Sequence, residues 1–179
     1  MGNTFVVVGR MQPMHKGHFS IIKYIVKHLD FDFDKDEIII VNGSANESRT
    51  DKNPFTWQER KEMVINTLKD EFGDKLKFRV EHINDYDDYM TWVDKLKKVV
   101  GRNKATIVGE DDVDYYGRLS GYKPVIVPQT INIHATQIRE KLAKGIIPDL
   151  CPEPVRKWLK ENNGVDIIKG CLKEDYFPY

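Results

Sequence analysis

The chain has 179 residues, of which 40% are hydrophobic and 31% are charged, so it is long enough to fold around one sizeable core. Basic and acidic residues number 28 each, and this balance gives no general electrostatic basis for binding a nucleic-acid backbone or an anionic membrane. Because the apolar runs fall far short of the ~20 residues that span a bilayer and no secretion signal is visible, we expect one soluble, cytoplasmic domain over residues 1–179.

Short runs of β-branched and aromatic residues predict buried strands. They cover residues 5–8, 38–41, 78–80, 106–108 and 125–127. Apolar residues recur at helical spacing between these runs. The helical patterns cover residues 19–29, 63–68 and 92–100. Alternation of strands and helices predicts an α/β fold with a parallel sheet covered by helices on both faces.

Capping signals place further helix boundaries. Thr56 and Glu59 have the spacing of a capping box, so a helix is expected to begin there. Residues 136–144 predict another helix that ends at a glycine, and a C-terminal helical segment is expected over about residues 151–163. The last residues, 174–179, are expected to be the least ordered. The two cysteines have no metal-ligand spacing and are interpreted as ordinary structural thiols.

Glycines, cations and two histidines directly follow the first predicted strand. The segment from Gly9 to His18 reads Gly-Arg-Met-Gln-Pro-Met-His-Lys-Gly-His. In a parallel sheet this is the carboxyl edge of a strand, where a helix N-terminus offers free amides to a phosphate. One histidine or glycine at such a turn is commonplace, but this combination favours a polyphosphate site.

This segment resembles the signature of nucleotidylyltransferases with a His-x-Gly-His motif, and among them the nicotinamide-nucleotide adenylyltransferases of archaeal type. Met11 replaces the usual phenylalanine. The chain is also similar to the adenylyltransferase half of bifunctional adenylyltransferase/Nudix proteins. Further matching segments are residues 43–45, 52–56, 59–60, 135–139 and 149–165. The resemblance implies a Rossmann-like nucleotidylyltransferase fold and transfer of the adenylyl group of ATP to nicotinamide mononucleotide, giving NAD and pyrophosphate.

The resemblance also implies the roles of individual residues. His18 is assigned to the transferring α-phosphate, His15 to the phosphate chain nearby, and Arg10 with Arg139 to the charge on the departing pyrophosphate. The ATP site as a whole is expected to comprise Gly9, Arg10, Met11, Gln12, His15, Gly17, His18, Gly109, Asp111, Ile133, Thr136 and Arg139. The nicotinamide mononucleotide site is expected to comprise Gly43, Ser44, Lys52, Asn53, Asp85, Tyr86, Tyr89 and Trp92.

Some positions in these motifs leave alternatives open. Trp92 is implied to stack on the pyridine ring, although a tryptophan at helical spacing is otherwise a core residue. His134 stands where serine is usual, and it either pairs with phosphate or lies nearby. Tyr89 falls where relatives tend to have a small polar residue, so the preference between the mononucleotide and its deamidated acid form stays open.

The expected reaction needs no general base, because the acceptor phosphate is already ionised near neutral pH and can attack the α-phosphorus directly. Mg²⁺ is expected to arrive with ATP and no protein metal site is expected. The neighbouring Asp111, Asp112 and Asp114 are interpreted as a solvated helix start rather than metal ligands. The resemblance further implies a homo-oligomer.

Two other functions are compatible with parts of the sequence. A nucleotidylyltransferase could act on another phosphorylated acceptor, but Gly-Arg-x-Gln-Pro before the histidines and Lys-Asn-Pro-Phe-Thr after the second strand resemble the nicotinamide branch. A non-catalytic ATP- or NAD-sensing module would predict decay of His15, His18 and Arg139, which are all present. The sequence contains no Glu-rich motif of the pyrophosphate-hydrolysing domain that some relatives carry, so we expect adenylyl transfer alone. A nucleic-acid-binding role lacks a basic stripe.

Overall fold

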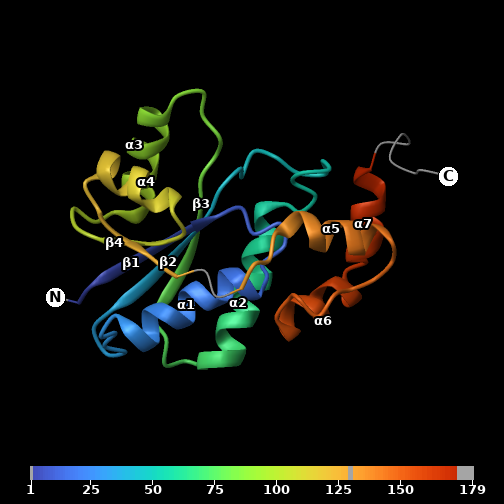
Figure 1. Ribbon diagram of the computed structural model, residues 1–179, viewed down its shortest axis with the longest axis horizontal. Helices are drawn as coiled ribbons and strands as arrows, with labels where there is room; N and C mark the ends of the chain where they lie inside the picture. The colour runs from blue at the N-terminus through green and yellow to red at the C-terminus, as the bar shows by residue number, and fades with distance from the viewer. Residues whose placement is uncertain (1, 129–130, 173–179) are drawn as a thin grey trace.

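The computed structural model of the protein describes residues 2–128 and 131–172 (Figure 1); the segment 174–179 therefore lies outside the described residues. The strands are β1 Thr4–Gly9, β2 Glu37–Asn42, β3 Phe78–His82, β4 Thr106–Gly109 and β5 Lys123–Ile126. The helices are α1 Lys16–His28, α2 Trp57–Phe72, α3 Tyr89–Val100, α4 Asp112–Ser120, α5 Ala135–Ala143, α6 Glu153–Glu161 and α7 Gly164–Cys171. Each predicted strand and helix is present, with boundaries shifted by a few residues.

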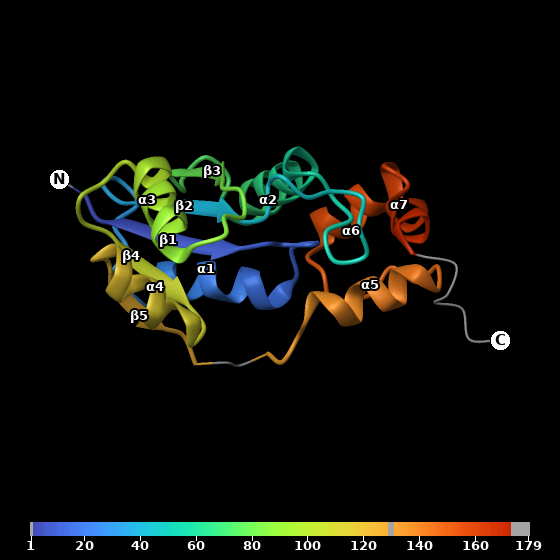
Figure 2. The same cartoon turned by 90° about the horizontal axis from the view of Figure 1, so that it is seen from above.

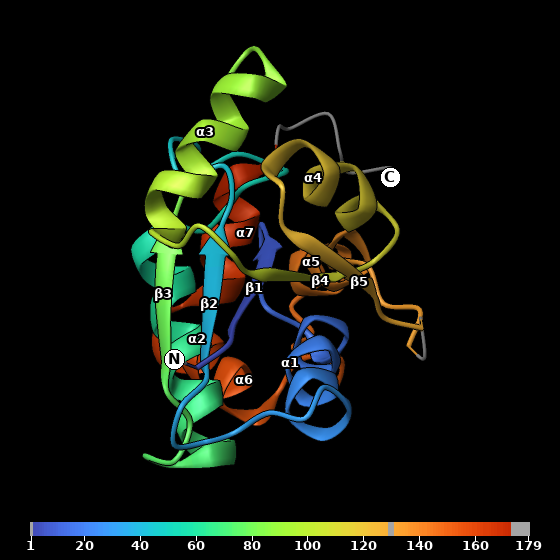
Figure 3. The same ribbon diagram turned by 90° about the vertical axis from the view of Figure 1, so that its left-hand side faces the viewer.

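The five strands form one sheet in the order β3-β2-β1-β4-β5, and each neighbouring pair is parallel (Figure 3). The chain proceeds from β1 outward to β3 and then crosses back to β4 on the other side of β1. The connections therefore diverge at the carboxyl ends of β1 and β4, and ligands bind at such a divergence in open α/β sheets. The predicted Rossmann-like parallel sheet is confirmed.

Helices cover both faces of the sheet, with α1 and α2 on one side and α3 and α4 on the other (Figure 1). Strand β2 shows why its sequence is continuously apolar. Ile38 and Ile40 belong to the core cluster that includes α1 and α2, whereas Ile39 and Val41 belong to the cluster with α3 and α4. Because successive strand residues point to opposite faces, a strand covered on both sides needs apolar residues at every position.

The C-terminal helices α5, α6 and α7 gather beyond one end of the sheet (Figure 2). The α6 helix packs on α2 and buries Trp158, whose ring meets Phe55 edge-on at a centroid distance of 5.9 Å. The helical segment expected over 151–163 corresponds to α6, and a further short helix, α7, which the sequence did not predict, begins at Gly164. This junction carries no side-chain cap, and a Cβ on Gly164 would lie 2.5 Å from Cδ2 of Leu159, so close packing rather than a capping motif sets it.

The two cysteines form no disulfide bond with each other. Cys151 and Cys171 are free. Burial raises the pKa of the Cys151 thiol to about 12, which keeps it protonated and unreactive at neutral pH. Within residues 2–128 and 131–172, no helix combines the length and the apolar composition that crossing a membrane requires.

The capping box predicted at the start of α2 is present and can be tested. The Thr56 hydroxyl accepts from the amide of Glu59 at 3.2 Å, and the Glu59 carboxylate accepts from the amide of Thr56 at 2.9 Å. Thr56→Ala should lower the free energy of unfolding by about 1 kcal/mol, measured by urea denaturation. Thr56→Ser keeps the hydroxyl and should cost much less. Equal losses in the two variants would show that the cap is not what stabilises this helix start.

Candidate active site

Two cavities lie at the carboxyl edge of the sheet and meet at the end of β1. Val8, Gly9, Arg10 and Asp112 line both of them. The histidine cavity has a volume of about 340 Å³ and is also lined by Met11, Gln12, His15, His18, Ile21, Gly109, Glu110, Val113, Ile133, His134, Ala135 and Arg139. The aromatic cavity has a volume of about 550 Å³ and is also lined by Gly43, Ser44, Asp85, Tyr86, Asp87, Asp88, Tyr89, Trp92 and Tyr116.

The two histidines are fixed by the backbone at the start of α1. His15 is the N-cap, and its Nδ1 accepts from the amides of Gly17 at 3.1 Å and His18 at 3.3 Å. Nδ1 of His18 accepts from the amide of His15 at 3.3 Å, and the two rings stack at a centroid distance of 3.7 Å. A neutral imidazole whose Nδ1 accepts carries its proton on Nε2. Both rings therefore keep an Nε2–H group for another partner.

Both imidazoles are neutral at neutral pH. Burial, helped by the charge of nearby His134, lowers the pKa of His15 to about 4. Burial, followed by the effect of His15, holds the pKa of His18 well below its ordinary value. The paired rings are thus uncharged N–H donors in the free protein rather than imidazolium ions.

Gly17 has a role that differs from the expected one. It does not line either cavity, but a Cβ at this position would lie 2.8 Å from Cε1 of His15. Glycine is therefore required to leave room for the capping imidazole. Lys16, which lies beside it, forms an ion pair with Asp149 at 3.2 Å rather than pointing its charge into a cavity.

The second predicted phosphate motif lies across the histidine cavity from α1. Arg139 donates from Nη2 to the hydroxyl of Thr136 at 3.4 Å and from Nη1 to the carbonyl of Gln12 at 3.1 Å. The two side chains of the motif therefore meet on one side of α5, as their spacing predicts. Arg139 lines the cavity. Thr136 does not line it, but its hydroxyl helps to orient the guanidinium of Arg139.

Gln12 lines the histidine cavity, but its side chain is already engaged. Its amide donates to the carbonyl of Phe55 at 3.0 Å, and its oxygen accepts from the amide of Phe55 at 2.9 Å. This pair of bonds ties the loop after β1 to the segment that precedes α2. The carboxamide of Gln12 therefore acts structurally, and its backbone carbonyl meets Arg139.

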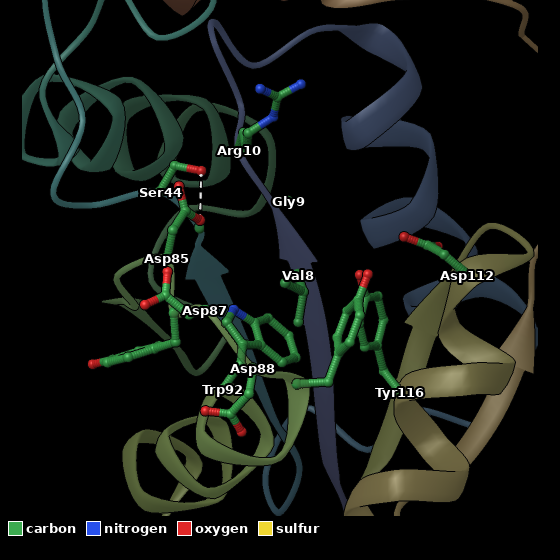
Figure 4. A pocket seen from close by; sticks show the side chains of 13 residues that line it. Val8, Gly9, Arg10, Ser44, Asp85, Asp87, Asp88, Trp92, Asp112 and Tyr116 are labelled. Carbon is green, nitrogen blue, oxygen red and sulfur yellow. Dashed lines mark hydrogen bonds between the residues drawn. The ribbon is translucent and has the colours of Figure 1, made fainter.

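The aromatic cavity has a polar end and an aromatic end (Figure 4). Arg10 lies at one end, and Trp92 lies at the other beside Tyr116, with a ring centroid distance of 4.9 Å. Between them, the Ser44 hydroxyl donates to Asp85 at 2.9 Å. This arrangement suits a ligand with an anionic group and a flat ring at opposite ends.

A buried arginine joins the loops that form the two cavities. Arg60 of α2 is fully buried, and its Nη1 donates to the carbonyl oxygens of Arg10 at 2.6 Å and Gly43 at 2.7 Å, while Nη2 donates to that of Ser44 at 3.3 Å. Burial, and then the charge of Arg10, lower the pKa of Arg60 to about 10. The guanidinium nevertheless stays charged at neutral pH. We refer to its three hydrogen bonds to the carbonyl oxygens of Arg10, Gly43 and Ser44 as the Arg60 clamp.

The structure places most of the predicted site residues on the two cavities. Nine of the twelve residues predicted for ATP line the histidine cavity, the others being Gly17, Asp111 and Thr136. Of the residues predicted for the mononucleotide, Lys52 and Asn53 do not line the aromatic cavity. Asn53 is buried, and its backbone N–H donates to the Thr50 hydroxyl at 3.0 Å. Asn53 therefore helps to shape its own loop.

Sequence reasoning missed three residues that the site depends on. Asp112 was interpreted as part of a solvated helix start, and it is exposed, but it also lines both cavities. Tyr116 lies one turn further along α4 and faces Trp92. Arg60 appeared only as part of a resemblance. The i, i+4 spacing of Asp112 and Tyr116 would have placed them on one face of a helix, but nothing local indicates what that face meets.

Within the described part of the chain, no group of three or more histidine, cysteine, aspartate or glutamate side chains is placed to hold a metal ion. The histidine cavity instead offers imidazole N–H groups and two guanidinium groups, a donor set that fits phosphate oxygens.

Removal of the buried guanidinium should destabilise the protein strongly. Arg60→Met leaves three carbonyl oxygens without their donor, and we expect a loss of about 3 kcal/mol or more in the free energy of unfolding, measured by urea denaturation. Arg118→Met is the matched control, because Arg118 is exposed and forms an ion pair with Asp114 on its own helix, and it should cost less than about 0.5 kcal/mol. Similar losses in the two variants would contradict the role of the clamp.

The low pKa of His15 predicts a pH-dependent loss of stability. Between pH 6.5 and about 4 the unfolded chain binds a proton at this position that the folded protein does not, so stability falls on acidification by up to about 3 kcal/mol. His15→Asn retains a capping side chain and should show a smaller loss over the same range in pH-dependent denaturation. Identical pH profiles would show that His15 titrates normally in the folded state.

Comparisons with known proteins agree with this geometry. The model of the cytidylyltransferase-like family matches residues 6–141. A nicotinamide-nucleotide adenylyltransferase from Pyrococcus furiosus is 38% identical over 168 residues, which cover 90% of this chain and 85% of that protein. One from Methanococcus maripaludis is 33% identical over 174 residues, which cover 95% of this chain and 96% of that protein.

A solved structure shares the fold over nearly the whole chain. A bifunctional NMN adenylyltransferase/ADP ribose pyrophosphatase from Francisella tularensis, complexed with AMP and a manganese ion, superposes with a TM-score of 0.82 at 26% identity. The match covers 98% of this chain and 53% of the other, so this chain spans about half the length of that protein. The fold, the family model and the relatives agree: the chain belongs to the cytidylyltransferase-like family and, within it, to the nicotinamide-nucleotide adenylyltransferases.

Proposed function

We propose that this protein transfers the adenylyl group of ATP to nicotinamide mononucleotide and releases NAD and pyrophosphate. The observation that carries the proposal is the junction of the two cavities at the end of β1. There, a phosphate-binding set of imidazole and guanidinium donors adjoins a cavity with an aromatic end. Two bound nucleotides would thus bring a donor phosphate and an acceptor phosphate together.

ATP fits the histidine cavity. Its phosphates would lie along the start of α1, where two fixed Nε2–H groups and the positive end of the helix dipole favour anions. Arg139 lies across the cavity from the histidines and suits the β- and γ-phosphates. The adenosine end would lie toward Gly109 and Glu110, which line the same cavity at the end of β4.

Nicotinamide mononucleotide fits the aromatic cavity. Its 5′-phosphate would lie at the Arg10 end, beside the shared residue Gly9, and its ring at the Trp92 end. Ser44 and Asp85 lie between them and can bond the ribose hydroxyls. The rings of Trp92 and Tyr116 already pack against each other, with their centroids 4.9 Å apart. A ligand ring that stacks on Trp92 must therefore displace Tyr116 or use the other face of the indole.

The reaction is a direct displacement. A phosphate oxygen of the acceptor attacks the α-phosphorus of ATP, the bond from that phosphorus to the bridging oxygen breaks, and pyrophosphate leaves with the electron pair. No proton has to be removed from the acceptor. His18 would donate from Nε2 to the α-phosphate and His15 to the adjoining phosphate, while Arg10 and Arg139 offset the charge that develops on pyrophosphate. A Mg²⁺ ion bound to ATP would supply further charge neutralisation on the phosphates.

Loss of the His18 donor should slow the chemical step. His18→Ala is expected to reduce kcat for NAD formation from nicotinamide mononucleotide, ATP and Mg²⁺ by at least ~10²-fold, with much smaller changes in KM. His28→Ala is the matched control, because His28 lies exposed near the far end of the same helix, and it should leave kcat unchanged.

Two results would count against the proposal. If the unmodified protein binds both nucleotides but forms neither NAD nor pyrophosphate, the adenylyl transfer assignment fails. If His18→Ala raises KM and leaves kcat intact, His18 contributes to ground-state binding rather than to the transition state. Self-association stays a prediction of the family resemblance, and a cytoplasmic location stays a prediction from the sequence alone.

A further inference from the structure

Charge is distributed unevenly along the aromatic cavity. Four carboxylates line it, Asp85, Asp87, Asp88 and Asp112, against the single guanidinium of Arg10. Asp87 and Asp88 lie near Trp92, whereas Arg10 lies at the opposite end (Figure 4). The cavity is therefore cationic where an acceptor phosphate would lie and anionic where the ring would lie.

Among the described residues that line this cavity, no lysine or arginine lies at the ring end beside Asp87 and Asp88. Asp88 is the N-cap of α3, and its carboxylate accepts from the amide of Thr91 at 2.8 Å. This bond lowers the pKa of Asp88 and keeps it ionised at neutral pH. The amine of Lys95 lies 5.9 Å from the centroid of the Tyr86 ring, and Lys95 does not line the cavity.

We propose that Asp87 and Asp88 are specificity-determining residues that make the site accept the mononucleotide with a neutral carboxamide and reject the deamidated form, whose ring carries a carboxylate. This inference rests on the proposed function, because it concerns the acceptor of the same reaction. It deepens that function by assigning the choice between two acceptors of nearly identical shape.

The physical basis is the charge of the ring in each acceptor. The pyridinium nitrogen is positive in both, and carboxylates beside an aromatic wall attract such a cation. A carboxylate on the ring cancels that attraction and is repelled by Asp87 and Asp88, whereas a carboxamide can donate its N–H groups to them. Like-charge juxtaposition of this kind opposes binding of the deamidated ligand.

The test compares kcat/KM for the two mononucleotides. The unmodified protein should prefer the amide by at least about tenfold, which corresponds to about 1.4 kcal/mol. The double variant Asp87→Asn, Asp88→Asn should bring the ratio close to one, chiefly through a lower KM for the deamidated acceptor. Asparagine at position 88 preserves the N-cap of α3, so the loop and helix should keep their geometry.

Asp94→Asn is the matched control. It removes one carboxylate from an exposed position of the same helix that lines neither cavity, and the ratio should change less than about twofold. Direct titration of the two mononucleotides without ATP provides a second readout, in which only the double variant should bind the deamidated form more tightly.

The possible failures are distinguishable. If both acceptors react equally well with the unmodified protein, or if the double variant keeps its preference, the inference is wrong and the proposed function stands. An equal shift in the Asp94→Asn control would assign the preference to the overall field of α3 and overturn the role of the two residues. If neither acceptor reacts, the proposed function fails and the inference falls with it.

Discussion

The active site depends on the buried guanidinium of Arg60. The loops after β1 and β2 each contain a non-glycine residue in the left-handed region, with φ of 49° at Met11 and at Ser44. Such conformations are unfavourable by themselves and persist only where the surroundings hold them. Arg60 donates to carbonyl oxygens within or next to both residues. One side chain thereby offsets the strain in two loops that line different cavities.

This clamp explains how two nucleotide sites come to share a boundary. In an open parallel sheet the loops at the carboxyl edge are separate segments, and nothing in the strands fixes one loop against another. Arg60 fixes the loop after β1 relative to the loop after β2, and Gln12 fixes the former to the backbone of Phe55. Arg10, one of the residues that line both cavities, is held within this network through its own carbonyl.

The features that local sequence determines were predictable. Continuous apolar runs correspond to strands covered on both faces, and the Thr56 capping box sets the start of α2 as expected. The Gly9–His18 segment forms a strand end, a turn and a helix start, so its two histidines meet at the N-terminus of α1. Trp92 and Asp85, which the resemblance assigns to the mononucleotide, both line the aromatic cavity.

The features that depend on packing between distant segments were not predictable. In the sequence, Arg60 has no feature that distinguishes it from a surface arginine of a helix. Its role depends on the packing of α2 against the two loops. Tyr116 and Asp112 acquire a role only because α4 lies beside β4 and α3. The start of α7 follows from close packing of Gly164 on Leu159, which no capping motif announces. In each case the partner lies outside the window that local patterns cover.

The fate of the α-phosphate tests adenylyl transfer most directly. The protein would be incubated with nicotinamide mononucleotide, Mg²⁺ and ATP that carries a radioactive phosphorus at either the α or the γ position. Attack at the α-phosphorus predicts that the α label appears in NAD and the γ label in pyrophosphate, in equal amounts. The appearance of the α label in AMP or ADP, or of the γ label in inorganic phosphate, would contradict the account.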